Sequence, residues 1–221
     1  MSRKRNDKEV RRLAGSAMLL ALAAALQLLS NYVQFGTFSI TLALIPIVLA
    51  GILYGIVPGT LVGLAVGALT IAAPATYGGY FFQTRPAATI MICLVKMTMA
   101  GFLPAMVFRF LRKRSFNAGV IVASLLAPLT NTGLFAAGAA IFFYPVMEAS
   151  INAQFATPAA VLFLSWIGLN FVLEFVINAA LSPALVYVSR FAFRKVNIGA
   201  DDIGLQSGEG SKDAEPVAEN N

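Results

Sequence analysis

Residues 158–191 read PAAVLFLSWIGLNFVLEFVINAALSPALVYVSRF, and from Pro158 to Val188 the only charged side chain is that of Glu174. About 20 apolar residues are enough to cross the roughly 30 Å hydrocarbon core of a bilayer as a helix. This longer stretch therefore predicts a transmembrane helix. It also places one carboxylate far from either end of that helix.

Five further apolar segments precede this one along the chain. The six segments are 13–30, 40–54, 59–75, 87–111, 119–144 and 158–191. The second and third are short and share a GIVPG turn at 55–59, which predicts a tight helical hairpin. Of the 221 residues, 58% are hydrophobic and 12% are charged, against about 45–50% and about 25% in soluble domains. The predicted fold class is an all-α membrane protein, a six-transmembrane-helix bundle.

The basic residues predict the orientation of this bundle. Lys and Arg near helix ends are retained in the cytoplasm, and all but two of the 16 lie at the N-terminus, at 109–114 or beyond residue 189. An even number of spans with both termini inside (N-in/C-in) places all of these in the cytoplasm. The other two are Arg85, in an external connection, and Lys96, within a span. Such dispersal at helix ends argues against a nucleic-acid partner, although the net charge is +6.

The chain is thus divided into three parts. A cytoplasmic basic N-terminus (1–12) precedes the six-helix transmembrane domain (13–195), and a polar tail (196–221) follows it. The tail is rich in Asp, Glu, Gly, Ser and Asn and has almost no large apolar residues. It is therefore expected to be disordered in the cytoplasm.

Several classes of chemistry are excluded by what the sequence lacks. Without histidine there is no Ser-His-Asp triad, imidazole zinc site or histidine proton relay. Cys93 is the single cysteine, so no disulfide forms within the chain, and no G-x-x-x-x-G-K-[ST] loop is present to hold ATP. We therefore expect no metal, no cofactor and no enzyme activity. A membrane-embedded hydrolase, the rival class, would need a metal cluster or a nucleophile with its base.

Two charged side chains are predicted to lie near the middle of the membrane. Lys96 lies 11 residues after Arg85 and 13 before Arg109, and Glu174 lies 16 residues before Arg190. A charge at this depth costs about 2.5–3.5 kcal/mol even on lenient insertion scales. Each of the two is therefore a candidate functional residue.

Other polar side chains are expected at the same depth. On the last span, Asn170, Glu174 and Asn178 follow one another every fourth residue and share one helix face. Apolar walls with a few convergent polar groups are what a small-molecule pocket requires. The predicted substrate-binding residues are Lys96, Asn131, Thr132, Asn170, Glu174 and Asn178.

A second interpretation of the two charges is a buried Lys96–Glu174 ion pair that only holds the helices in register. Such pairs add little net stability once the cost of desolvation is counted. Both interpretations hold together if the pair opens to take a zwitterionic or carboxylate-bearing substrate. The residues alone do not decide between a substrate site and a structural ion pair.

Small residues recur every fourth position in two places. The glycine stripe consists of Gly59, Gly63 and Gly67, and the alanine stripe consists of Ala17, Ala21 and Ala25. Small residues let helix backbones approach closely within a membrane. We expect the glycine stripe to pack this chain's own helices. From the residues alone, internal packing is also favoured for the alanine stripe over a docking surface for another protein.

Four features in order carry a family resemblance. They are the basic N-terminus with its alanine stripe, LIPIVLAGILYGIVPG at 44–59, APLTNTGLF at 127–135 and NFVLEFVIN at 170–178. With the six segments, they resemble the substrate-specific (S) component of an energy-coupling factor (ECF) transporter over about residues 10–195. The resemblance depends on order and spacing and not on a single motif.

The resemblance implies a prokaryotic plasma-membrane protein that captures a water-soluble vitamin or related micronutrient from outside. It implies as partners a membrane T component, against which the S component topples to deliver its ligand, and two cytoplasmic ATPase subunits. In that family an A-x-x-x-A stripe on the first helix meets the T component. The resemblance therefore makes Ala17, Ala21 and Ala25 a partner interface. It also places the pocket among the last three helices, beneath a cover at residues 31–39.

The residues do not identify the substrate. Lys96 favours a compound with a carboxylate, such as pantothenate or a folate, whereas Glu174 and the asparagines suit a flavin or another heterocycle. Without histidine, the aromatic-histidine set of a thiamine pocket cannot be complete. The alternative function is a stand-alone secondary transporter or facilitator of a small polar solute.

Overall fold

The computed structural model describes residues 2–32, 34–35, 38–39, 41–72, 81–151 and 156–195. The predicted tail at 196–221 lies outside the described residues, as does part of the predicted cover at 31–39. Within the described part, the chain is helical apart from one pair of two-residue strands and short connections.

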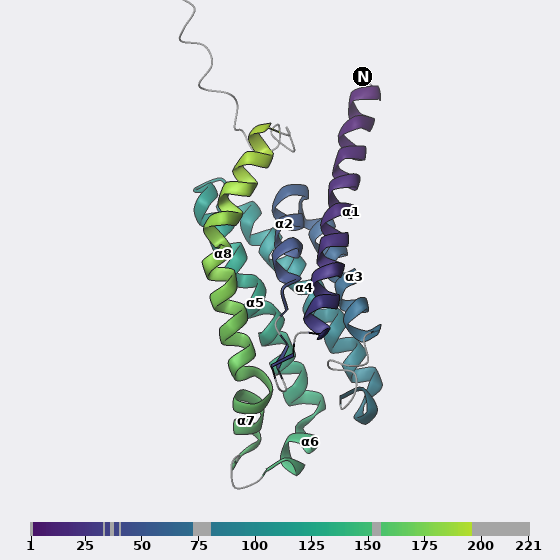
Figure 1. Cartoon of the computed structure of the whole chain (residues 1–221), viewed down its shortest axis with the longest axis vertical. Coiled ribbons are helices and arrows are strands. Elements are labelled where there is room, and N and C mark those ends of the chain that lie inside the picture. Colours follow the sequence, from purple (N-terminus) through teal and green to yellow (C-terminus); the bar gives the residue numbers. More distant parts are fainter. Residues whose placement is uncertain are drawn as a thin grey trace, which may run out of the picture.

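Figure 1 shows long helices running side by side along one axis. The long helices are α1 (Ser2–Tyr32), α4 (Pro86–Leu111), α5 (Phe116–Phe142) and α8 (Gly168–Lys195). The shorter ones are α2 (Leu44–Tyr54), α3 (Ile56–Ala72), α6 (Tyr144–Ala149) and α7 (Pro158–Ala160), and α7 continues into a π-helical segment, η2 (Val161–Ile167). Strand β1 (Gln34–Phe35) pairs antiparallel with β2 (Phe38–Ser39).

Four described stretches are long and apolar enough to cross a membrane. They are Glu9–Ser30, Pro86–Leu111, Phe116–Phe142 and Pro158–Arg194, and they correspond to four of the six predicted segments. The two segments predicted to be short are α2 and α3, with 11 and 17 residues. The all-helical membrane class is thereby confirmed. The crossing of all six segments and the N-in/C-in orientation stay predictions.

The predicted hairpin forms with a shorter turn than the sequence indicated. Gly55 alone separates α2 from α3, and its φ of 96° is one that residues with a Cβ rarely adopt. Pro58 lies within the first turn of α3, where a missing N–H removes no helical hydrogen bond. The third helix therefore begins at Ile56 and not at residue 59.

The glycine stripe packs α3 against its neighbours. A Cβ at Gly67 would lie 3.0 Å from the backbone oxygen of Cys93 on α4. A Cβ at Gly63 would collide with the backbone oxygen of Met97, and one at Gly59 would collide with the backbone of α2. The helix backbones touch where only glycine leaves room, so the predicted internal packing is confirmed.

The short helix α2 is the innermost element of the bundle. It contacts α1, α3, α4, α5 and α8, and Leu44, Ile47 and Ala50 on it are fully buried. One apolar cluster joins α2 to α1, α3 and α4, and a second joins it to α4, α5 and α8. This central position brings the start of α2 against the face of α8 that carries the polar residues.

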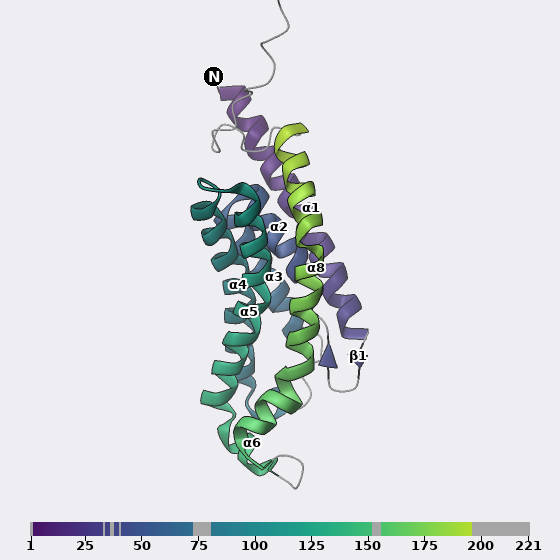
Figure 2. The same cartoon turned by 90° about the vertical axis from the view of Figure 1, so that its left-hand side faces the viewer.

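The two ends of the bundle differ. In both Figure 1 and Figure 2, α1 begins and α8 ends at the same end of the bundle, and the connection from α4 to α5 lies there too. Strand β1 and helix α6 lie at the opposite end. The three basic parts of the chain are therefore gathered at one end, as the predicted orientation requires.

Candidate binding site

The inner face of α8 carries three of the predicted site residues. Asn170, Glu174 and Asn178 are 8%, 1% and 2% exposed, respectively. They follow Gly168, from which α8 runs as a regular helix, so every fourth residue stays on one face. The fourth-residue spacing thus located a buried polar face correctly.

The Glu174 carboxylate is held by N–H groups from three parts of the chain. The backbone N–H of Thr41, just before α2, donates to Oε1 at 2.9 Å, and Asn170 Nδ2 donates to the same oxygen at 3.4 Å. Asn131 Nδ2, from α5, donates to Oε2 at 3.3 Å. Hydrogen bonds to a charged group contribute about 1.5–3 kcal/mol each. This one side chain therefore ties the segment that precedes α2 to α5 and α8.

Lys96 on α4 is also buried, with 3% of its surface exposed. Its ammonium lies 5.3 Å from the centroid of the Phe135 ring, within the range of a cation–π interaction. Among the described contacts, Glu174 accepts from amide N–H groups and not from this ammonium. The interpretation of Lys96 and Glu174 as an ion pair stays a prediction.

A small cavity lies between α4, α5, η2 and the start of α8. It is lined by Lys96, Asn131, Thr132, Phe135, Trp166, Ile167 and Asn170. Four of the six predicted residues are thus brought together, whereas Glu174 and Asn178 lie outside the lining. The cavity volume of about 10 Å³ is close to the minimum for one water molecule. A larger ligand would require neighbouring side chains to move.

Two aromatic lining residues were not among the predicted site residues. Phe135 lies four residues after Asn131 on α5, and Trp166 lies four residues before Asn170. The same fourth-residue spacing that gave the polar set would have given both. An aromatic side chain in an apolar span does not stand out by composition, so only its register with a polar neighbour marks it.

Some polar atoms at the site have no partner among the described residues. The Oδ1 atoms of Asn131, Asn170 and Asn178 are buried acceptors without a hydrogen bond. Leaving a buried acceptor unpaired costs about 1–3 kcal/mol. Two of these three residues, Asn131 and Asn170, line the cavity.

An aromatic cluster lies beside the cavity. Phe81, shortly before α4, makes edge-to-face contacts with Trp166 at 4.7 Å, Phe143 at 5.1 Å and Phe135 at 6.0 Å between ring centroids. Phe81 therefore packs on two of the residues that line the cavity. It is partly exposed, unlike the polar residues of the site.

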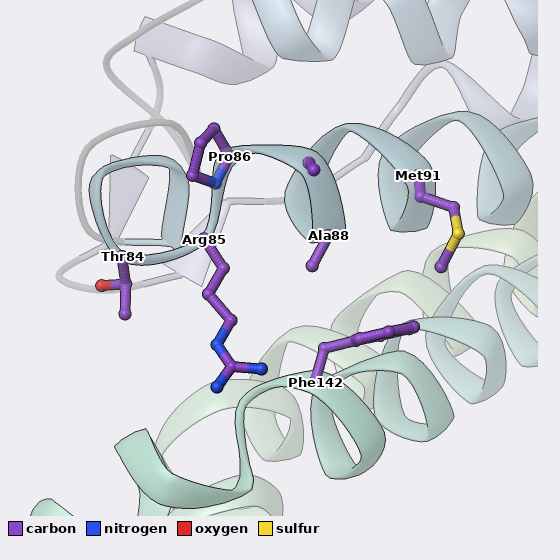
Figure 3. A pocket seen from close by; sticks show the side chains of 7 residues that line it. Thr84, Arg85, Pro86, Ala88, Met91 and Phe142 are labelled. Atoms are coloured by element: carbon purple, nitrogen blue, oxygen red, sulfur yellow. The ribbon is translucent and has the colours of Figure 1, made fainter.

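A larger and more open groove, of about 530 Å³, lies elsewhere, between the start of α4 and the end of α5 (Figure 3). It is lined by Thr84, Arg85, Pro86, Ala87, Ala88, Met91 and Phe142. Arg85 is its one charged lining residue and is exposed. None of the predicted binding residues borders this groove. We therefore place the candidate site at the inner cavity, where the buried polar groups converge.

The alanine stripe lies on the outside of α1. Ala17, Ala21 and Ala25 are exposed, whereas Ala23 between them is fully buried. Helix α1 packs against α2 and α3, and the exposed residues of α1 also include Met18. The internal packing that the residues alone favoured for this stripe is therefore not found. Its role as a partner interface stays a prediction.

Apolar helices enclosing a buried polar cavity define a membrane protein suited to bind a small molecule. The family model described as "ECF transporter, substrate-specific component" matches residues 11–186. The chain therefore belongs to the family of ECF transporter substrate-specific components, which are transporter subunits and not enzymes. Comparison with curated proteins and with solved structures gave no match.

Proposed function

We propose that this chain captures a water-soluble vitamin or related micronutrient from outside the cell and delivers it through an ATP-driven importer. The observation that carries the proposal is the family match over residues 11–186, together with a buried polar cavity between α4, α5 and α8. Energy would come from partner subunits, because the sequence has no phosphate-binding loop of its own. The protein would lie in the plasma membrane of a prokaryote.

The proposed topology has six membrane segments and both termini in the cytoplasm. It is supported by the gathering of the basic parts of the chain at one end of the bundle (Figures 1 and 2). The cavity would then be reached from the opposite end, where β1 and α6 lie. The two short helices α2 and α3 would form a hairpin inside the bundle.

The proposed substrate contacts are the polar groups of the cavity. Lys96 supplies a cationic donor and Asn131 and Asn170 supply acceptors, with Thr132 beside them. Glu174 and Asn178 support this set from the same face of α8. Since a cavity of about 10 Å³ is too small for such a substrate, we propose that Phe81, which packs on Phe135 and Trp166, moves away when the substrate enters.

The proposed partners are a membrane T component and two cytoplasmic ATPase subunits. The exposed alanine stripe on α1 is the surface that we assign to the T component. Small side chains there let a partner helix approach closely, which is how helices associate in a membrane. Neighbouring exposed apolar side chains, such as Met18 at 74%, would be covered in the same contact.

Native mass spectrometry of the purified protein tests the proposal directly. We expect a small polar molecule to co-purify, and we expect its uptake into cells to require the ATPase subunits. Uptake that persists without those subunits would instead identify a stand-alone facilitator. Failure to retain or bind any of pantothenate, folate and riboflavin, with no other molecule bound, would contradict the substrate-binding role.

A further inference from the structure

Glu174 does not line the cavity, yet it is bonded to two residues that do. Asn131 Nδ2 and Asn170 Nδ2 both donate to its carboxylate, at 3.3 Å and 3.4 Å. The third donor is the backbone N–H of Thr41. The carboxylate is therefore bonded to two lining residues although it is not itself part of the lining.

These hydrogen bonds fix which end of each amide faces the carboxylate. An amide side chain has a donor end and an acceptor end, and it can be turned over at little steric cost. A carboxylate only accepts, and three N–H groups on two oxygens match that form. Turning either amide over would place its oxygen against a negative charge.

The opposite ends of the same amides are the unsatisfied ones. Asn131 Oδ1 and Asn170 Oδ1 have no partner among the described residues, and these residues are only 3% and 8% exposed. A side chain that served only to hold helices together would gain nothing from an unpaired buried acceptor. Asn178 Oδ1 is unpaired too, but only Asn131 and Asn170 also line the cavity, so their oxygens can accept hydrogen bonds from a molecule bound there.

We propose that Glu174 is a positioning residue that presents two amide oxygens to the substrate, so that the substrate places N–H or O–H donors against Asn131 and Asn170. This inference rests on the proposed substrate-binding function and narrows the chemistry of the substrate. The part that enters between the two asparagines is a donor group, such as an amide, imide, amine or hydroxyl group. A carboxylate on the same molecule lies on the Lys96 side, away from these oxygens.

An exchange of the two partners tests the positioning role. In Glu174→Gln, the new amide can donate or accept, so the orientation of Asn131 is no longer fixed. In Glu174→Gln combined with Asn131→Asp, the Gln amide donates to one oxygen of the new carboxylate and the other oxygen stays an acceptor. The matched control combines Glu174→Gln with Asn178→Asp, because Asn178 Nδ2 donates to the backbone oxygen of Glu174 and not to its carboxylate.

Binding is read from the emission of Trp166, which is the single tryptophan of the chain and lines the cavity. The probes are pantothenate, folate and riboflavin, titrated against the purified wild type and each variant. We expect Glu174→Gln to weaken binding at least tenfold, the exchange with Asn131 to return it to within about threefold, and the control exchange to leave it weak. Wild-type affinity in Glu174→Gln, or an exchange no better than the control, would overturn the positioning role.

A test on the wild-type protein does not depend on the folding of any variant. For the probe that the wild type binds, each N–H or O–H group is methylated in turn and the titration is repeated. We expect at least one methylated derivative to bind at least tenfold more weakly, because it leaves a buried amide oxygen unpaired. Equal binding of every derivative would overturn the inference, whereas the lack of binding of any probe would count against the proposed function itself.

Discussion

The glycine stripe on α3 and the alanine stripe on α1 have the same spacing and opposite surroundings. Gly63 and Gly67 lie against the backbone of α4, whereas Ala17, Ala21 and Ala25 are exposed. Both stripes meet the rule that small residues every fourth position allow close helix contact. Spacing therefore identifies a surface suited to close packing but not the helix that packs there.

The residue type separates the two stripes better than the spacing does. At the glycine stripe even a Cβ would collide with a backbone atom, so the contact within the chain has the closest possible approach. At the alanine stripe each residue carries a methyl group and is exposed, so none of the described helices of this chain covers it. Substitutions in the two stripes should therefore have different effects on stability.

The largest expected effect is that of filling the glycine stripe. Gly63→Leu would push a side chain into the backbone oxygen of Met97, and we expect it to lower the free energy of unfolding by at least about 3 kcal/mol. The matched control is Gly133→Leu on α5, where a Cβ meets nothing within 4 Å. Thermal unfolding in detergent measures both. Equal stability of the two variants would mean that α3 and α4 are not in backbone contact.

The next prediction compares substitutions at two nearby alanines on α1. Ala23 is fully buried, whereas Ala21 is exposed. We expect Ala23→Leu to cost about 1–3 kcal/mol of unfolding free energy through overpacking. Ala21→Leu should change it by no more than about 0.5 kcal/mol, as for surface substitutions. The same unfolding measurement checks the pair, and a larger loss for Ala21→Leu would return the alanine stripe to internal packing.

A smaller effect, on substrate binding and not on stability, is expected for a substitution in the cavity. Lys96→Ala removes the buried cation of the cavity, and we expect at least tenfold weaker substrate binding, about 1.4 kcal/mol. Val95→Ala is the control, since Val95 is the preceding residue on α4 and is 44% exposed. Titration of Trp166 emission measures both variants. Unchanged affinity in Lys96→Ala would show that this lysine has only a structural role.

Much of the fold followed from the sequence because apolar length and fourth-residue periodicity are local properties. They gave the helical segments, the short hairpin and the buried face of Asn170, Glu174 and Asn178. Counting residues from the ends of a span also gave a common depth for Lys96 and Glu174. Depth along the membrane normal is fixed by the rise per residue of a helix.

The partners at that depth could not be derived in the same way. Which side chains meet depends on how each helix is rotated about its own axis. That rotation is determined by the stripes of small residues and by core packing across the whole bundle. Thr41 donates to a carboxylate 133 residues away, and Lys96 lies over Phe135. Neither contact has a local sequence signal. The exposure of the alanine stripe likewise depends on which face of α1 the other helices cover.

The most direct test of the account is to measure uptake and binding for one variant, Ala21→Trp. The exposed position predicts that the purified variant binds substrate as the wild type does. Cells that express it with the T component and both ATPase subunits should lose uptake, because the bulky ring keeps the partner helix away from α1. Normal uptake by this variant would contradict the assignment of the alanine stripe as the surface through which the chain joins its transporter.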